Sequence, residues 1–246
     1  MSNERICLVT TPAIDYLHFP DKTTADSNGG TTPFYRRALS GSSLVDVNLI
    51  WISPPKKTEV HIYPLENYGF GINDSTVDSK SFNDVFTDDS QLDILISTTL
   101  RSDFDLTLLK PHLEKIRFLF IDVQGFTRNG REHEYFNFPE WLLKHEGLIF
   151  KIGEEEYPYV NIESIIENPK TIVLSTKGKQ GFTLMHDGNE INIPPSEVVD
   201  TESGGDRGAG DTLLVNFAVN YLQNTDIEQA ARGAEQSVIR FLRGGK

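Results

Sequence analysis

The sequence has little cysteine and no long apolar segment. Cys7 is its one cysteine, so an internal disulfide is excluded, and with it a disulfide-stabilised fold. Cys7 lies in an apolar run, where we expect a buried small hydrophobic residue. No run reaches the roughly 18 apolar residues of a membrane-spanning helix. We therefore expect a soluble, cytoplasmic protein with no membrane partner.

Positive charge is also scarce. The 246 residues include 23 Lys and Arg against 36 Asp and Glu, which gives a formal net charge of −13. This excess of negative charge argues against nucleic acid as a partner and against docking on anionic lipid. A small anionic ligand stays open, because backbone N–H groups at a helix N-terminus can bind phosphate without Lys or Arg.

Short apolar runs recur along the chain and are nearly continuous rather than alternating. They cover residues 6–10, 49–53, 93–98, 118–123, 148–153 and 171–176. This pattern is typical of strands buried on both faces of a parallel sheet. Segments of helix length lie between or beside them, at residues 31–43, 103–117, 136–145 and 159–168. The alternation predicts a doubly wound α/β fold, in which ligands bind beyond the carboxyl ends of the strands.

The C-terminal part is predicted to be helical. Residues 211–222 carry an apolar face at helical spacing. Asp226, with Gln229 three residues on, predicts the start of a second helix that runs to about Leu242. Residues 54–91 break the alternation, with several Pro and Gly and a strand-like run at 59–64, and predict an insertion over the sheet edge or a small lid.

A glycine-rich segment at residues 204–212 is the densest chemical signal. Gly208, Ala209 and Gly210 precede the first C-terminal helix, where successive N–H groups form an anion site. Asp211 then falls in the first helical turn, and its carboxylate can take the proton of an attacking hydroxyl. The same spacing also fits a plain glycine loop with Asp211 as the helix N-cap. No Walker A motif occurs, and no Gly-x-Gly-x-x-Gly follows the first strand.

This segment resembles a known signature. Gly208-Ala209-Gly210-Asp211-Thr212, preceded by Val199-Asp200-Thr201, is similar to the C-terminal motif of the ribokinase-like (PfkB-type) carbohydrate kinases. Further similar segments follow the family's order, at residues 13–16, 29–30, 121–128, 151–156 and 176–181. The resemblance implies one ribokinase-like kinase domain over residues 1–246, with 54–91 as a reduced lid or insertion. The implied architecture is a three-layer α/β/α sandwich with a mostly parallel sheet and a reduced β lid.

The resemblance also implies a function and roles for individual residues. The function is ATP-dependent transfer of a phosphoryl group to a hydroxyl of a small sugar, nucleoside or polyol. Asp211 would be the general base, with the amides of Gly208, Ala209 and Gly210 as the anion hole. Asp15, Gly29 and Gly30 would bind the substrate. Thr176, Gly178 and Gly181 would shape the nucleotide pocket, Arg207 would add positive charge over the phosphates, and Glu156 would help to organise Mg²⁺.

Three departures from the family pattern keep alternatives open. Gly153 replaces the Asn of an Asn-x-x-Glu motif, Phe34 replaces a substrate-contacting Asn, and six residues (202–207) stand where the family usually has one. A non-catalytic or regulatory sugar- or nucleotide-binding protein on the same fold is the alternative function.

Plainer interpretations also exist for single segments. Residues 29–30 and 176–181 fit ordinary turns, 154–156 fits a solvated acidic face, Asp15 fits a strand-end polar residue, and Arg207 fits a solvated loop residue. Many family members pair through their lids, so the resemblance raises a homodimer, while the acceptor stays unidentified.

Overall fold

A large, mostly parallel sheet organises the molecule. The computed structural model describes residues 4–18, 21, 23–40, 47–63, 68–72, 75–87, 91–100, 103–129, 132–200, 206–224 and 226–244. The sheet has eight strands in the order β14-β13-β12-β11-β8-β7-β1-β4. Its parallel strands are β1 (Glu4–Thr10), β4 (Val47–Ile52), β7 (Leu92–Thr98), β8 (Ile116–Asp122), β11 (Leu148–Gly153) and β12 (Ile172–Thr176). These are the six strands predicted from the apolar runs, so that prediction is confirmed.

Two antiparallel strands close one edge of the sheet. They are β13 (Phe182–His186) and β14 (Asn189–Ile193). A turn containing the 3₁₀ segment η4 (Gly178–Gln180) joins β12 to β13. The hairpin interpretation of residues 176–181 is therefore confirmed.

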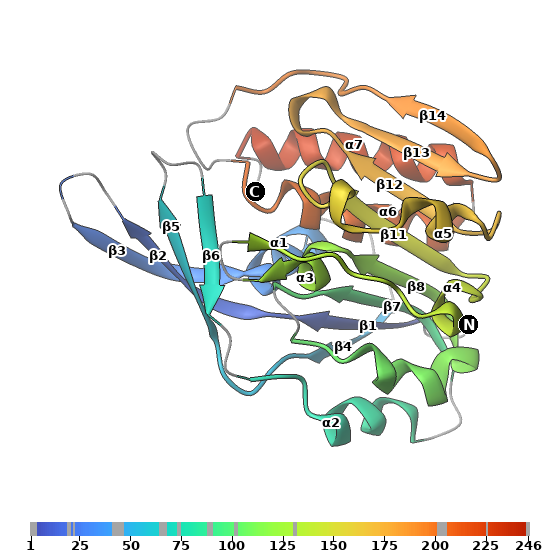
Figure 1. The fold of residues 1–246 in the computed structure, drawn as a ribbon. Coiled ribbons are helices and arrows are strands. Elements are labelled where there is room, and N and C mark those ends of the chain that lie inside the picture. Colours follow the sequence, from blue (N-terminus) through green and yellow to red (C-terminus); the bar gives the residue numbers. More distant parts are fainter. Residues whose placement is uncertain are drawn as a thin grey trace.

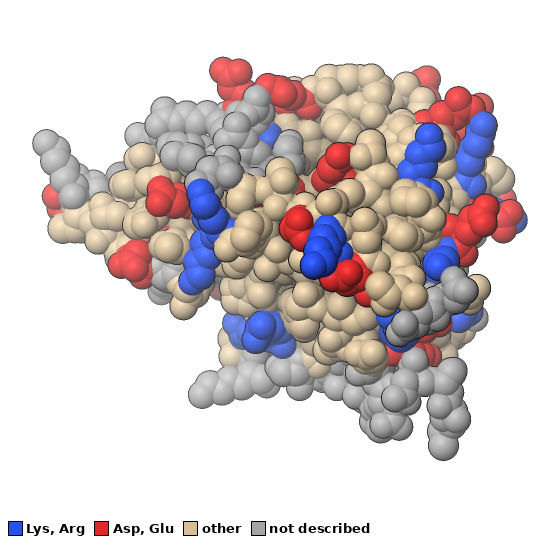
Figure 2. All heavy atoms as spheres, turned by 90° about the horizontal axis from the view of Figure 1, so that it is seen from below, with Lys and Arg blue, Asp and Glu red and all other residues tan. Residues whose placement is uncertain are grey.

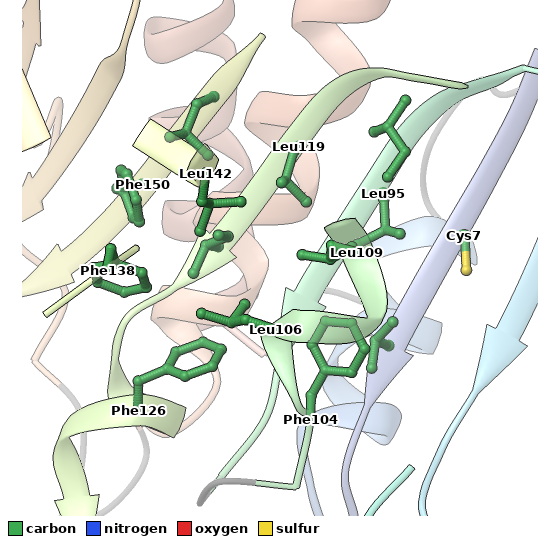
Figure 3. Close-up of a cluster of buried hydrophobic side chains, with 14 of the residues drawn as sticks. Cys7, Leu95, Phe104, Leu106, Leu109, Leu119, Phe126, Phe138, Leu142 and Phe150 are labelled. Atoms are coloured by element: carbon green, nitrogen blue, oxygen red, sulfur yellow. The ribbon is translucent and has the colours of Figure 1, made fainter. Parts of the chain in front are cut away.

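Helices cover both faces of the sheet (Figure 1). One face holds α1 (Thr31–Ser40), α6 (Ala209–Asn224) and α7 (Ile227–Leu242), packed with Leu8 and Ile94. Neighbouring strand residues such as Cys7 and Leu95 point to the other face, because side chains alternate along a strand. Figure 3 shows that second cluster, which includes Cys7 and Leu109. The predicted three-layer α/β/α architecture is confirmed.

Cys7 is fully buried, as predicted. Burial raises the pKa of its thiol to about 12. The side chain therefore acts as a small hydrophobic residue in the core.

The second face carries shorter helical segments than the sequence predicts. They are α2 (Ser79–Asn83), η1 (Asp84–Phe86), η2 (Leu106–Lys115), α4 (Glu140–Leu143), η3 (Tyr157–Tyr159) and α5 (Ile162–Ile166). The α-helix predicted over 103–117 is instead the 3₁₀ segment η2, since Pro111 inside it removes a backbone donor. The helix predicted over 136–145 is wrong for its first four residues, because Pro139 stands at the N-cap of α4. The helix predicted over 159–168 is reduced to the single turn of α5.

The C-terminal helices match their prediction closely. The Gln229 N–H donates to Asp226 Oδ1 at 3.0 Å, which satisfies an otherwise unpaired donor at the start of α7. After α7, Gly244 adopts a φ of 72°, the left-handed conformation typical of a helix end. The α1 helix predicted over 31–43 ends at Ser40, and residues 41–46 lie outside the described part.

A small second sheet projects from the main body (Figure 1). Its order is β3-β2-β5-β6, with β2 (Pro12–His18), β3 (Thr24–Gly30), β5 (Thr58–Tyr63) and β6 (Tyr68–Ile72). Residues 54–91 contribute β5 and β6 to this sheet, while Phe82 of α2 and Phe86 of η1 pack into the main core. The predicted strand at 59–64 corresponds to β5, although Pro64 lies outside the described residues.

The surface carries charges of both signs. On the face seen in Figure 2, basic side chains stand among acidic ones rather than in one basic patch. Within the part of the chain that the structure describes, no helix is both long enough and apolar enough to span a membrane.

Candidate active site

The carboxyl ends of the parallel strands meet at one edge of the main sheet. Thr98 ends β7, Asp122 ends β8 and Gly153 ends β11. Strand β1 lies between β4 and β7, so the chain reverses its direction of strand addition there. Open α/β sheets bind ligands beyond the strand ends at such a switch point. The side chain of Asp211, near the start of α6, meets the end of β7 at this edge.

Asp211 is held in a defined orientation. The Thr98 hydroxyl donates to Asp211 Oδ1 at 3.0 Å, and Asp211 is 8% exposed. Burial, with the nearby Asp122 carboxylate, raises the pKa of Asp211 to about 7, although Lys151, Thr98 and Arg128 act in the opposite direction. Asp211 is the third residue of α6, so the interpretation as an N-cap is wrong. A carboxyl group with a pKa near neutrality can exchange protons at physiological pH.

The loop before α6 offers backbone donors. Gly208 has a φ of 84°, and a Cβ there would collide with the Phe34 ring, so only glycine suits this position. Among the residues that the structure describes, the N–H groups of Gly208, Gly210 and Asp211 have no hydrogen-bond acceptor. The Ala209 N–H, by contrast, donates to the Asp206 carbonyl at 3.0 Å. Of the three amides predicted for the anion hole, that of Ala209 therefore already has an acceptor, and the anion hole itself stays a prediction.

A buried ion pair lies beside this loop. Lys151 Nζ on β11 donates to Asp122 Oδ2 at 2.8 Å, and both side chains are almost fully buried. A Cβ on Gly210 would lie 3.0 Å from Lys151 Nζ, so the ammonium packs against the first turn of α6. Burial by itself would lower the pKa of Lys151, but the carboxylates of Asp122, Glu156 and Asp211 raise it above its ordinary value. Lys151 therefore stays charged.

Glu156 belongs to a second ion pair. Its Oε1 accepts from Arg128 Nη2 at 2.8 Å, and it is 3% exposed. Although burial acts in the opposite direction, Arg128 and Lys151 lower the pKa of Glu156. A Cβ on Gly153 would collide with Glu156 Oε2, so the absence of the family's Asn makes room for this carboxylate. The solvated-face interpretation holds for Glu154 and Glu155 but is wrong for Glu156.

The substrate-binding candidates lie on the small sheet. Asp15 on β2 lies against Gly29 on β3, where a Cβ would collide with the Asp15 carboxylate. Gly30, with a φ of 78°, packs on the Thr11 carbonyl and leads directly into α1. Arg207 Nη1 lies 3.9 Å from Asp15 Oδ2. Burial raises the pKa of Asp15, and Arg207 and a hydrogen bond from the Gly30 backbone partly offset this. Arg207 thus faces Asp15 rather than standing alone in solvent.

The nucleotide-pocket candidates lie at the end of β12. Thr176 closes β12, and Gly178 and Gly181 have φ values of 52° and 88° in the turn that follows. A Cβ on Gly181 would collide with the Ile193 carbonyl of β14, which explains this glycine structurally. The register pairs Thr176 with Gly153, so this turn adjoins the Glu156 segment. Its predicted role in nucleotide binding stays a prediction.

The site also contains functional candidates without a role in the sequence prediction. Lys151, Asp122, Thr98 and Arg128 surround Asp211 or Glu156. Two of them have a signal in the sequence, a charge in a buried apolar run: Lys151 interrupts 148–153, and Asp122 follows four apolar residues. Such charges are rarely buried without a partner or a function.

The sheet topology places the chain in a known fold class. The chain has the ribokinase fold, as predicted. It matches a pyrophosphate-dependent kinase in the ribokinase family, complexed with a pyrophosphate analog and myo-inositol, over 97% of this chain and 94% of that one, with a TM-score of 0.71 and 17% identity. It also matches Arabidopsis thaliana ribokinase complexed with ribose and ATP, over 99% of both chains, with a TM-score of 0.58 and 15% identity. Likenesses at these identities establish the fold.

A more specific similarity covers part of the sequence. An 81-residue stretch is 33% identical to inositol 3-kinase from Zea mays, which is 33% of this chain and 20% of that protein. The chain thus spans about a fifth of the length of the curated relatives it matches. No protein-family model matches the sequence.

Proposed function

We propose that this protein is a kinase that transfers a phosphoryl group to a hydroxyl of a small neutral polyol. One observation carries the proposal: a buried carboxyl group, Asp211, with a pKa of about 7, adjoins N–H groups that have no acceptor among the described residues. Phosphoryl transfer needs this combination of a base for the attacking hydroxyl and preorganised donors for the transferred group.

The proposed mechanism follows from these positions. The free oxygen of the Asp211 carboxylate accepts the proton of the acceptor hydroxyl, while Thr98 holds Oδ1. The acceptor oxygen then bonds to the terminal phosphorus, and the bond from that phosphorus to the bridging oxygen of the donor breaks. The N–H groups of Gly208, Gly210 and Asp211 donate to the oxygens of the transferred group. The proton stays on Asp211 until solvent removes it.

The acceptor candidates follow from the small sheet and from the relatives. The Asp15 carboxylate, buried against Gly29, accepts hydrogen bonds from hydroxyl groups and disfavours an anionic acceptor. Phe34, where the family has Asn, adds an apolar surface beside Gly208. A cyclic polyol such as myo-inositol, which is bound in one structural match and gives the inositol 3-kinases their name, is the first acceptor candidate. Ribose is the second candidate.

Two donors are consistent with the site. ATP is the donor that the motifs imply, and Thr176, Gly178 and Gly181 would adjoin its nucleoside. Pyrophosphate is the second candidate, because a pyrophosphate-dependent kinase shares the fold. The cations of Arg128 and Lys151, paired with Glu156 and Asp122, could attract its charge without a nucleoside.

Mg²⁺ would accompany either donor. Among the described residues, no group of three or more His, Cys, Asp or Glu side chains could hold a metal ion. The Glu156 carboxylate is already paired with Arg128. Mg²⁺ would thus bind mainly to the donor phosphates, with Glu156 reaching it through water, and it would neutralise phosphate charge there. Removing Mg²⁺ with a chelator should abolish turnover.

The test is a coupled assay of the purified protein with myo-inositol, ribose and a nucleoside, each with ATP and with pyrophosphate. We expect turnover with at least one pair and a loss of about 100-fold or more in Asp211→Asn. Glu167→Gln, at the exposed end of α5, is the matched control and should keep full activity. Ligand binding without turnover would instead support the binding-protein alternative.

A further inference from the structure

Among the residues that the structure describes, Lys151 is the one lysine buried in the candidate site. It is 6% exposed and stands in the middle of the otherwise apolar strand β11. Burying a charge is unfavourable unless partners compensate it, and replacement of a buried ion pair by apolar residues is often neutral for stability. A role in stability alone therefore gives little reason for a lysine at this position.

The contacts of Lys151 join two parts of the site. Its Nζ is anchored by Asp122 Oδ2 at 2.8 Å at the end of β8. Its Cε and Nζ would lie 2.9 and 3.0 Å from a Cβ on Gly210, so glycine at that position lets the ammonium approach the first turn of α6. The ammonium thus reaches the turn that carries Asp211 from the side of the sheet.

The charged groups around Asp211 show how Lys151 affects the ionisation of the Asp211 carboxyl group. Asp122 on β8 repels a charge on Asp211, while Lys151 on β11 and Arg128 on β9 (Arg128–Asn129) attract it. The uncharged hydroxyls of Thr98 on β7 and Tyr35 on α1 also lie near Asp211, and Glu156 faces Lys151. Three carboxyl groups thus share two cations, and Lys151 is the more deeply buried of the two.

We propose that Lys151 is a positioning residue that keeps Asp211 in the charged form needed by a base, through an ammonium fixed by Asp122 and seated against Gly210. The inference rests on the proposed phosphoryl transfer. In this role Asp122 has two effects: it anchors the ammonium, and it opposes the charge of Asp211. The pair therefore sets the pH range in which Asp211 accepts a proton.

The experiment compares pH profiles of kcat/KM from pH 5 to 9 for wild type, Lys151→Met, Asp122→Asn and the double variant. Lys151→Met should move the acidic midpoint upward by about one unit or more, the size expected when an opposite charge is removed. Asp122→Asn should move it downward, and the double variant should return towards wild type. A merely structural lysine would lower activity without moving the midpoint, and an unmoved midpoint in Lys151→Met overturns the proposal.

Two further measurements keep the test decisive. If Lys151→Met does not fold, Gly210→Ala keeps both charges but displaces the flexible end of Lys151, and it should also raise the midpoint. If wild type shows no turnover, the proposed function fails, but the electrostatic inference is still measured. The free energy of unfolding is measured against pH for proteins with and without Asp211→Asn, and the difference reports the ionisation of Asp211. The same difference is then measured in the Lys151→Met background. An identical pH dependence in both backgrounds contradicts the inference.

Discussion

At the scale of a residue, the burial of Asp211 opposes the ionisation of its carboxyl group. Its carboxyl group is buried beside Asp122, so charging it in the folded protein is costlier than in the unfolded chain. The folded-state pKa of about 7 lies above the unfolded value near 4, so the folded state binds this proton more tightly. The stability that Asp211 contributes is therefore lost as pH rises from about 4 to about 7.

Asp211→Asn should accordingly stabilise the protein at pH 8, because it removes a charge that the fold accommodates poorly. The pKa difference sets an upper limit of roughly 4 kcal/mol. Urea unfolding at pH 8 and at pH 5 measures the effect. At pH 5 the wild-type carboxyl group is mostly protonated, so the variant should gain much less there. An equal gain at both pH values would show that the effect does not arise from ionisation.

At the scale of elements, the starts of α6 and α7 fix where these two helices pack on the sheet. Helix α6 begins at the glycine loop and buries Leu214 and Phe217 against the sheet. Helix α7 packs on α6 and buries Ala230, Ala231 and Ala234. The Asp226 cap therefore supports the start of the helix that holds α6 in place.

Asp226→Ala should destabilise the fold by about 1 kcal/mol, since the Gln229 N–H loses its acceptor. Asp226→Asn, which keeps an acceptor oxygen, should lose at most a few tenths of that amount. Denaturant unfolding of both variants separates the cap from the charge. Equal losses in the two variants would assign the effect to the negative charge at the helix N-terminus rather than to the hydrogen bond.

At the scale of the whole molecule, the candidate site residues come from two sheets. The main sheet and α6 supply Asp211, whereas the small sheet supplies Asp15. Arg207, directly before Gly208, lies with its Nη1 3.9 Å from Asp15 Oδ2 across this boundary. Arg207 is partly exposed and the two groups are at the limit of ion-pair distance, so this pair contributes about 1 kcal/mol or less to folding.

Asp15→Asn should raise the KM for the acceptor by about 10-fold or more with a smaller change in kcat, because a hydrogen bond to a charged group is lost in ground and transition states alike. Steady-state kinetics at saturating donor measures both constants. Arg207→Gln provides the comparison, and its unfolding free energy should stay within about 1 kcal/mol of wild type. A fall in kcat with an unchanged KM would place Asp15 in the chemical step instead.

Local patterns in the sequence were sufficient to predict the architecture and part of the candidate site. Continuous apolar runs predicted the six parallel strands, because a strand buried on both faces can hold few polar residues. The Asp226–Gln229 spacing predicted the start of α7, because a cap bridges residues close in sequence. The glycine segment predicted Asp211 near the start of a helix, because these residues are also close in sequence.

The local patterns could not predict the contacts between segments that are distant in the sequence. Folding joins Lys151 to Asp122 across 29 positions and Thr98 to Asp211 across 113, and no local spacing encodes either pair. The room that Gly153 leaves for Glu156, and the place of Phe34 over Gly208, likewise depend on which elements pack together. The pKa of Asp211 depends on these assembled charges and on burial, so only the folded molecule could reveal it.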